Sequence, residues 1–464
     1  MPSGPERFVA HPNFAIEFTR AREVLLAHPG RWRILYHYDG DGIASASAAI
    51  RALRRLGFPV QATPFQGVER GHMQELLRAT GGPVLVVDTG ASWLDLYAAH
   101  PHPVVVLDHH TYPAQEAAAH LPDRVAFVNP LDWEVDGMSE MCAATLTWLY
   151  TIFLDPKNWD NAPWGISGAI ADRQHVGGFR GLNAKLVEEA GTRGLVQPRP
   201  RLGLSGPTIG AALTRSIDPF FRGLSGRPEA AAAFLTGLGI DPGRAPDALS
   251  AAHREHLAEA LGHQLAEQRV RPEFQEAFRA PGWFLPSVGL DAEELSNLQN
   301  ATGREGIPGI GIALALGDRG ALDRARGSEE AWRTGILGGL RRIEDGGVRE
   351  LPALQWFESP DGSLAGTQAG LAMNFLLDPH RPVVVASPPG PGPIRVSARG
   401  TLHLVGEGLD LAVALREAAG AVGGEGGGHR VAAGATLPAG TLSEFLRHID
   451  RIVAGQIPRD GGTP

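Results

Sequence analysis

The chain has 464 residues, with 42 Lys or Arg against 51 Asp or Glu, which gives a formal net charge of −9. At about 100–200 residues per domain, this length predicts two to four domains with room for hydrophobic cores. Its 60 Gly and 36 Pro show no fixed period, and its single cysteine cannot form an internal disulfide, which excludes collagen-like and disulfide-stapled folds. The negative charge argues against a general nucleic-acid coat protein but not against a local basic groove.

Targeting and membrane segments are not expected. The N-terminal residues lack a basic segment followed by an apolar one, and no run of about 18 uncharged apolar residues occurs. The lone Cys142 fits a reducing compartment. We therefore expect a cytoplasmic protein without membrane contact.

The first third of the sequence has the pattern of a parallel sheet. Short apolar segments that end in polar residues predict strands at 32–36, 83–87, 103–107 and 125–128. Helices are expected between them at 44–56, 73–79 and 114–120. Two of the strands are Val-rich without alternation, which is typical of strands buried on both faces. This order predicts an α/β fold with a doubly wound parallel sheet, in which ligands bind at the carboxyl ends of the strands.

The rest of the chain divides into a helical region and a second α/β domain. Amphipathic segments such as 229–234 and 251–268 predict a mostly helical middle region. Strands are then predicted at 353–358, 382–386 and 394–398, and helices at 367–377, 409–419 and 442–454. The predicted domains are 1–190, a connector at 191–346, a smaller α/β domain at 347–455 and a flexible tail at 456–464.

Acidic and imidazole side chains follow three of the predicted strands. Because alternate residues of an extended chain share a face, the first three of these side chains are expected to converge on one spot. Carboxylates gathered this closely repel one another unless cations or protons intervene, and carboxylate with imidazole suits divalent transition metals. Each motif alone could be a turn, a helix cap or an incidental pair, but their joint placement favours a metal site. The residues are His37, Asp39, Asp41, Asp88, Asp108, His109 and His110.

These motifs, HxDxDG, a strand-terminal Asp and DHH, resemble those of the DHH phosphoesterase superfamily. Residues 168–174 are similar to the family's GxxxDxQ segment, which supplies a metal ligand from a helix. The resemblance implies two divalent ions, Mn²⁺ first and Mg²⁺ as the alternative. It implies that His37, Asp39 and Asp88 hold one ion. It implies that the other ion is held by Asp41, Asp88, His109 and Asp172, with Asp88 bridging.

The resemblance also implies roles for the remaining polar residues. His110 would face the scissile phosphate, and Asp108 would orient the histidines. In the C-terminal domain, the GGGH motif and the strand at 394–398 resemble the DHH-associated domain. A glycine run alone is more typical of a flexible turn, but here it is expected to form a phosphate-binding loop. The implied substrate-binding residues are Arg395, Arg399, Gly426, Gly427, Gly428 and His429.

The middle region indicates the branch of the superfamily. Its roughly 150 residues resemble RecJ-type nucleases, especially archaeal RecJ-like proteins, although the chain lacks the length for the extra nucleic-acid-binding barrel of bacterial RecJ. We therefore expect a hydrolase of phosphodiester bonds, namely an exonuclease on single-stranded DNA or RNA with a role in DNA repair or replication. The alternatives are a phosphodiesterase on short oligonucleotides or cyclic dinucleotides, and a non-catalytic replisome scaffold. The archaeal resemblance implies a replisome partner, the GINS complex.

Overall fold

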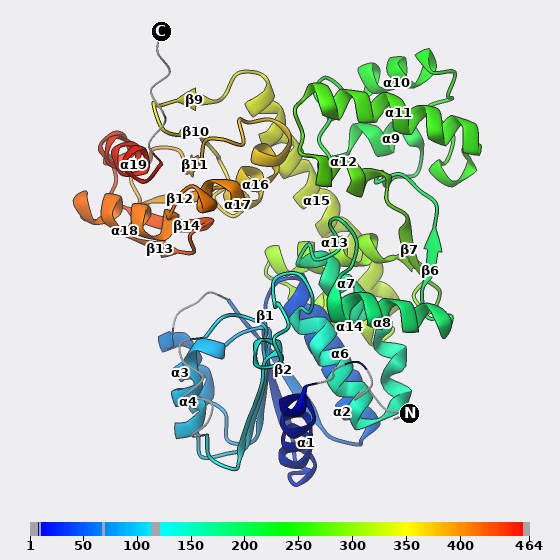
Figure 1. Cartoon of the computed structure of the whole chain (residues 1–464), viewed down its shortest axis with the longest axis vertical. Helices are drawn as coiled ribbons and strands as arrows, with labels where there is room; N and C mark the ends of the chain where they lie inside the picture. The colour runs from blue at the N-terminus through cyan, green and yellow to red at the C-terminus, as the bar shows by residue number, and fades with distance from the viewer. Residues whose placement is uncertain (1–7, 9–10, 67–69, 113–120, 458–464) are drawn as a thin grey trace. The chain divides into compact units, whose positions relative to one another are not determined.

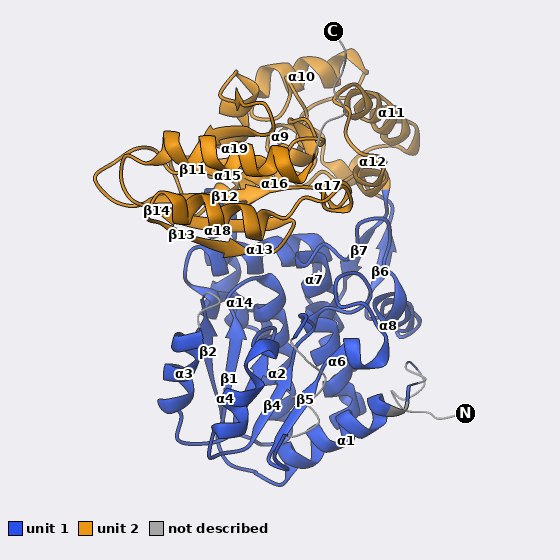
Figure 2. Cartoon of the chain, turned by 60° about the vertical axis from the view of Figure 1, so that its left-hand side comes forward, with its two compact units in different colours: residues 1–200, 280–332 blue, residues 201–279, 333–464 orange. Residues whose placement is uncertain are grey.

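The computed structural model describes residues 8, 11–66, 70–112 and 121–457 (Figure 1). The chain forms two compact units, coloured separately in Figure 2. Unit 1 comprises residues 1–200 and 280–332, and unit 2 comprises 201–279 and 333–464. Part of the predicted connector thus belongs to the unit that contains the predicted metal site. The domain borders placed after residues 190 and 346 stay predictions. Among the described helices, none has both the length and the apolar character that a membrane span requires.

Unit 1 is built on a five-stranded parallel sheet with the order β2-β1-β3-β4-β5, which confirms the predicted doubly wound fold. Its strands are β1 (Trp32–His37), β2 (Val60–Phe65), β3 (Val84–Val87), β4 (Val104–Leu107) and β5 (Val125–Val128). The apolar pattern did not predict β2, because this edge strand contains Gln, Thr and Pro and fully buries only Phe65. The strand order reverses at β1 and β3, and open sheets of this kind bind ligands where the order reverses.

Helices cover both faces of this sheet. One face packs against α1 and α2, with α6 and α7 lying on α2, and the other face packs against α3 and α4 (Figure 1). The expected helix at 114–120 lies outside the described residues. The helices are α1 (Pro12–Leu26), α2 (Gly40–Arg55), α3 (Arg70–Arg78), α4 (Leu94–Ala99), α6 (Ala143–Leu154), α7 (Ala162–Ala171) and α8 (Gly181–Thr192).

Residues 280–332 complete unit 1 in a way that the sequence pattern did not predict. A three-stranded antiparallel sheet joins them to the end of the first segment, through β6 (Gln197–Arg199), β7 (Gly282–Leu285) and β8 (Leu290–Asp291). Helices α13 (Ala292–Arg304) and α14 (Pro308–Ala315) then pack against α2, and α13 also packs against α7. Leu295 and Leu298 of α13 belong to the same buried core as the sheet. This segment is therefore part of the domain that holds the predicted metal ligands.

Unit 2 contains a six-stranded mixed sheet with the order β13-β14-β12-β11-β10-β9, in which only β10 and β11 pair in parallel. The strands are β9 (Arg349–Glu350), β10 (Gln355–Glu358), β11 (Val383–Ala386), β12 (Ile394–Arg399), β13 (Glu425–Gly428) and β14 (Ala432–Leu437). One face packs against α18 (Leu411–Ala421) and α19 (Leu442–Gln456). Because α19 continues to Gln456, only residues 458–464 of the expected tail lie outside the described residues.

The helices of unit 2 between residues 209 and 344 confirm the mostly helical middle region. Helix α15 (Arg319–Glu344) belongs to unit 1 as far as residue 332 and to unit 2 from residue 333. The helices are α9 (Ile209–Thr214), α10 (Pro228–Gly237), α11 (Ala251–Glu267), α12 (Pro272–Arg279), α15 (Arg319–Glu344), α16 (Ala365–Phe375) and α17 (Leu402–Gly406).

The predicted phosphate-binding loop at Gly426–Gly428 is instead an edge strand, β13, which pairs antiparallel with β14. A tight turn joins the two strands, with His429 N–H donating to the Ala432 carbonyl at 2.8 Å. Gly426 lies so close to α18 that an added Cβ would be 2.6 Å from the Leu415 carbonyl oxygen. Pairing and close packing therefore account for glycines whose local pattern is typical of a turn.

Gly168 determines how closely α7 approaches α2 and α6. A Cβ at this position would overlap with Ala144 and lie 2.8 Å from Asp41 Oδ1. We expect Gly168→Ala to lower the free energy of unfolding by about 1–3 kcal/mol, measured by chemical denaturation, because overpacking displaces the neighbouring backbone. Gly191→Ala is the matched control, since Gly191 is an exposed position of α8 with open space around it. This control should gain up to about 1 kcal/mol from helix propensity, and equal losses in both variants would contradict the argument.

Candidate metal centre

The predicted metal ligands lie at the carboxyl edge of the sheet of unit 1. His37 ends β1, Asp88 follows β3 and the DHH motif follows β4. Two further carboxylates come from helices, Asp41 from the first turn of α2 and Asp172 from the C-terminal cap of α7. The structure thus brings these side chains together where the strand order reverses, as expected for a ligand site in an open parallel sheet.

The extended-chain prediction for the HxDxDG segment was wrong for Asp41. The strand ends at His37, and Asp39 caps α2 by accepting a 3.2 Å hydrogen bond from Gly42 N–H. Asp41 therefore lies in a helical turn, where alternate residues do not share a face. As a result Asp41 groups with His109 and Asp172, whereas His37 and Asp39 group with Asp88.

Asp88 lies between these two groups. Its Oδ2 is 3.6 Å from His37 Nδ1, and its Oδ1 is 3.4 Å from His109 Nε2. A carboxylate whose two oxygens face two ligand groups has the arrangement required to bridge two metal ions. Asp88 also has φ 59°, a left-handed conformation that is uncommon for a residue other than glycine. Such backbone conformations cost about 1–3 kcal/mol and cluster at functional sites.

The Asp41 carboxylate is oriented by the N-terminus of α6. Its Oδ2 accepts from Ala143 N–H at 3.0 Å and its Oδ1 from Ala144 N–H at 2.9 Å. The side chain is almost fully buried. The first N–H groups of a helix have no partner within the helix and hold partial positive charge, so this position stabilises the carboxylate and fixes its orientation.

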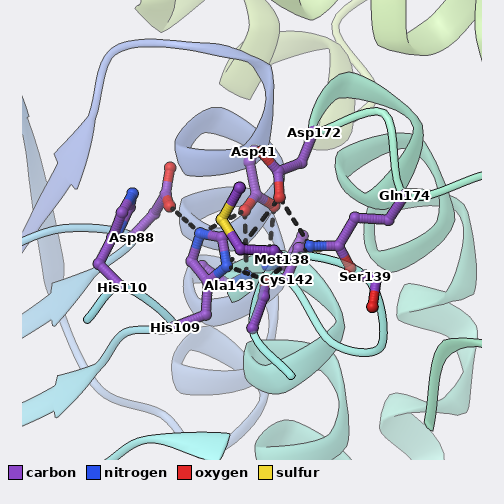
Figure 3. A network of polar contacts seen from close by, with 12 residues as sticks. Asp41, Asp88, His109, His110, Met138, Ser139, Cys142, Ala143, Asp172 and Gln174 are labelled. Carbon is purple, nitrogen blue, oxygen red and sulfur yellow. Dashed lines mark hydrogen bonds and ion pairs between the residues drawn. The ribbon is translucent and has the colours of Figure 1, made fainter. Parts of the chain in front are cut away.

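His109 is fixed with one ring nitrogen directed at the carboxylates (Figure 3). Its Nδ1 donates to the Gly137 carbonyl at 2.7 Å, which leaves Nε2 free to face the carboxylates, 3.8 Å from Asp41 Oδ2. Gln174 Nε2 donates to the same carbonyl at 2.8 Å and to Asp172 Oδ2 at 2.7 Å. The Gly137 carbonyl therefore links two proposed ligands. Sequence analysis missed it because a backbone acceptor leaves no side-chain pattern.

Asp108 and His110 adjoin the cluster, because their polar side-chain atoms and those of Asp88 and His109 lie within 4.8 Å of one another. Asp108 is fully buried and accepts from His110 Nδ1 at 2.7 Å, from Ala91 N–H at 2.7 Å and from His109 N–H at 2.9 Å. The Asp108 carboxylate raises the pKa of the half-exposed His110 to about 9. His110 is therefore protonated at neutral pH.

The charges of the cluster fit a bound cation. Burial raises the pKa of Asp172 to about 6, and Asp88 adds to the rise. Burial also raises the pKa of Asp41 well above its usual value, with Asp88 and Asp172 contributing. Burial lowers the pKa of His37, but the nearby carboxylates outweigh this effect and the net shift is upward. Asp41, Asp88 and His109 are buried, and a set of carboxylates and imidazoles with pKa values raised in this way is chemically suited to divalent transition metals.

Two family models match the chain. The model of the DHH family, N-terminal domain, matches residues 31–172, and that of the DHHA1 domain matches residues 362–455. The chain therefore belongs to the DHH superfamily. The first match contains every predicted metal ligand, and the second contains every predicted substrate-binding residue.

Known proteins resemble the chain over most of its length. An uncharacterized protein of Methanocaldococcus jannaschii is 25% identical over 443 residues, 94% of this chain and 96% of that protein. RecJ of Thermus thermophilus in complex with Mn²⁺ matches with a TM-score of 0.57 and 19% identity over 97% of this chain. The chain spans only 55% of that RecJ.

Two further structures match nearly end to end. Exonuclease RecJ bound to manganese has a TM-score of 0.56 and 18% identity, with 94% of each chain covered. CDC45 from Entamoeba histolytica has a TM-score of 0.68 and 10% identity, with 94% of this chain and 99% of CDC45 covered. At these identities the likeness concerns the fold, and it confirms that the chain has a RecJ-like fold.

Metal affinity is expected to fall as the pH is lowered through about 6. Below its pKa of about 6 Asp172 holds a proton that a cation must displace to bind, and the upward shift of the Asp41 pKa, caused mainly by burial, acts in the same direction. Calorimetric titration with Mn²⁺ between pH 5 and 8 should show a loss of about tenfold in affinity per pH unit for each displaced proton. An affinity independent of pH across this range would contradict the assignment of these carboxylates as ligands.

Proposed function

We propose that the chain is a metal-dependent phosphodiesterase that degrades single-stranded DNA or RNA from an end, as a RecJ-like exonuclease. The observation that supports this most directly is the position of Asp88, with one oxygen facing each of two ligand groups. Membership of the DHH superfamily and the likeness to manganese-bound exonuclease RecJ agree with it. In this proposal residues 1–190 bind the metals and 347–455 bind substrate.

The proposed ligands form two sets that share Asp88. One ion is held by His37, Asp39 and Asp88, and the other by Asp41, Asp88, His109 and Asp172, with Mn²⁺ expected first and Mg²⁺ as the alternative. Two such ions lower the pKa of water and stabilise negative charge on phosphate oxygens.

The protein's own acid is His110. The Asp108 carboxylate holds Nδ1 and keeps the ring protonated, so that Nε2 can donate a proton to the oxygen that leaves phosphorus. Asp108 in turn stays ionised, because it accepts hydrogen bonds from backbone N–H groups as well as from this histidine. The pair thus supplies a fixed proton donor beside the cluster.

The sheet of unit 2 offers a face for substrate phosphates. Arg395, Ser397 and Arg399 alternate along β12 and so share one face. Gly434 of β14 lies opposite Ser397, and Gly427 of β13 lies opposite Gly434. No atom would lie within 4 Å of a Cβ at Gly427, so the β13 edge of this face is open, whereas Gly366 of α16 lies close to Arg399 and Ser397. We propose that Arg399 and Arg395, with Gly427, Gly428 and His429, contact phosphates there, whereas the predicted contact by Gly426 is less favoured because this glycine packs against α18 on the opposite face.

Two other functions fit parts of the structure. A phosphodiesterase on short oligonucleotides or cyclic dinucleotides would use the same metal ligands. A non-catalytic replisome scaffold agrees with the likeness to CDC45, but the presence of all the predicted ligand side chains at one site favours catalysis. Binding to a GINS-like replisome complex is part of the proposal on the strength of the archaeal resemblance alone.

The direct test is degradation of end-labelled single-stranded DNA and RNA of two lengths, about 5 and about 40 nucleotides, with Mn²⁺ or Mg²⁺. Wild-type protein should degrade the long substrates, and Asp88→Asn should lose at least about 100-fold of the rate because both ligand groups lose a shared charge. Asp95→Asn is the matched control, since Asp95 is an exposed acid of unit 1 paired with Arg70. Cleavage of only the short substrates would favour the oligonucleotide alternative, and no turnover would contradict a nuclease.

Substrate binding by unit 2 is tested by Arg399→Ala. Loss of a charged hydrogen-bond donor to phosphate typically costs about 1.5–3 kcal/mol, so KM should rise about 10- to 100-fold while Mn²⁺ affinity stays constant. Arg416→Ala is the control, because Arg416 is exposed on α18, on the opposite side of the sheet. Steady-state kinetics on a labelled oligonucleotide measure both. An unchanged KM for Arg399→Ala would remove this face from the proposal.

A further inference from the structure

Helix α13 contacts the loop that contains the first metal-ligand motif. Asn300 Oδ1 accepts a 2.8 Å hydrogen bond from the N–H of Gly40, the residue between Asp39 and Asp41. Gly40 is the first residue of α2, and its N–H has no partner within the helix. A side chain 260 positions away in the sequence therefore satisfies the backbone between two proposed ligands.

The same helix approaches this loop without space for an extra methyl group. A Cβ at Gly303 would overlap with the Tyr38 carbonyl oxygen. A Cβ at Gly40 would lie 2.7 Å from Ala171 Cβ and 2.8 Å from Asn300 Oδ1. Glycines at these two positions allow the motif loop, the end of α7 and α13 to meet, and the contact leaves little freedom for any of them to shift.

The residue beside Asn300 holds the other ligand-bearing helix. Gln299 is fully buried, and its Oε1 accepts a 2.8 Å hydrogen bond from Ser167 Oγ of α7. Asp172 follows the last residue of α7. Two consecutive residues of α13 thus contact two different ligand-bearing segments. Asn300 binds the segment that contains Asp39 and Asp41, and Gln299 binds the helix that positions Asp172.

We propose that Asn300 is a positioning residue for the metal centre, which with Gln299 sets the spacing between the HxDxDG loop and Asp172. Its contact with the site runs through the backbone, because its oxygen accepts the hydrogen bond of Gly40 N–H. Without it, the freed N–H would compete for the Asp39 carboxylate, whose oxygens already face Gly42 N–H and His37. This inference rests on the metal-binding part of the proposed function and assigns a role to residues 292–304, which no metal-ligand motif includes.

The test is Mn²⁺ binding to the purified full-length chain, measured by calorimetry in the absence of substrate. Asn300→Ala should weaken binding by about 10-fold or more, the usual effect of removing a group that orients a metal ligand. Asn300→Asp keeps an oxygen acceptor and should restore most of the affinity. Gly303→Ala keeps Asn300 but pushes α13 away from Tyr38, and should weaken binding as well. Asn300→Ser serves the same purpose if the alanine variant does not fold.

A variant of a second buried amide side chain distinguishes a positioning role of Asn300 from a purely structural one. Asn158→Ala removes a side chain of unit 1 that donates to the Thr151 carbonyl at 2.7 Å and contacts Arg55 instead of any proposed ligand. It should lower the thermal midpoint and leave Mn²⁺ affinity unchanged. Wild-type affinity in Asn300→Ala, or equally weak binding in Asn300→Asp, would overturn the inference. If wild-type protein binds Mn²⁺ but degrades no nucleic acid, only the proposed exonuclease function is contradicted. If wild-type protein binds no Mn²⁺, both the proposed function and the positioning role of Asn300 are contradicted.

Discussion

Repulsion among buried carboxylates is the constraint around which unit 1 is organised. Asp41, Asp88 and Asp108 are all almost fully buried within one edge of a sheet. In this environment each negative charge needs a compensating partner. The fold supplies one for each: a helix N-terminus for Asp41, two imidazoles for Asp88, and backbone N–H groups with His110 for Asp108. Asp39 and Asp172 add further negative charge at the same edge, which the proposed cations would compensate.

The parallel sheet made the convergence of these side chains predictable. Strands buried on both faces have a continuous apolar pattern, and the carboxyl ends of parallel strands meet at one edge. His37, Asp88 and Asp108 could therefore be placed together from sequence alone. Asp41 was placed at the correct edge of the sheet but grouped with the wrong residues, because the chain turns from strand to helix within two residues after His37. That boundary depends on the Asp39 cap, which the strand pattern does not show.

Other features depend on contacts that no local pattern records. The Gly426–Gly428 segment resembles a turn until its pairing with β14 is known. Strand β2 lies at an edge, where burial is too incomplete to produce an apolar pattern. The Gly137 carbonyl acts through the backbone, and Asn300 acts across 260 positions. For the glycines, the Gly137 carbonyl and Asn300, the missing information is the identity of a distant partner, which composition and periodicity do not encode.

The interleaving of the two units has a consequence for how the chain matures during synthesis. The first 200 residues include all the proposed metal ligands, yet unit 1 is complete only at residue 332, after 79 residues of unit 2 have been made. The contact between Gly40 and Asn300 closes a very long loop, and contacts between distant residues form late and slow folding. A nascent chain can therefore expose the carboxylate cluster before α13 is available to order it. Metal capture and completion of unit 1 become linked events, so the availability of the ion during translation can influence the yield of folded protein.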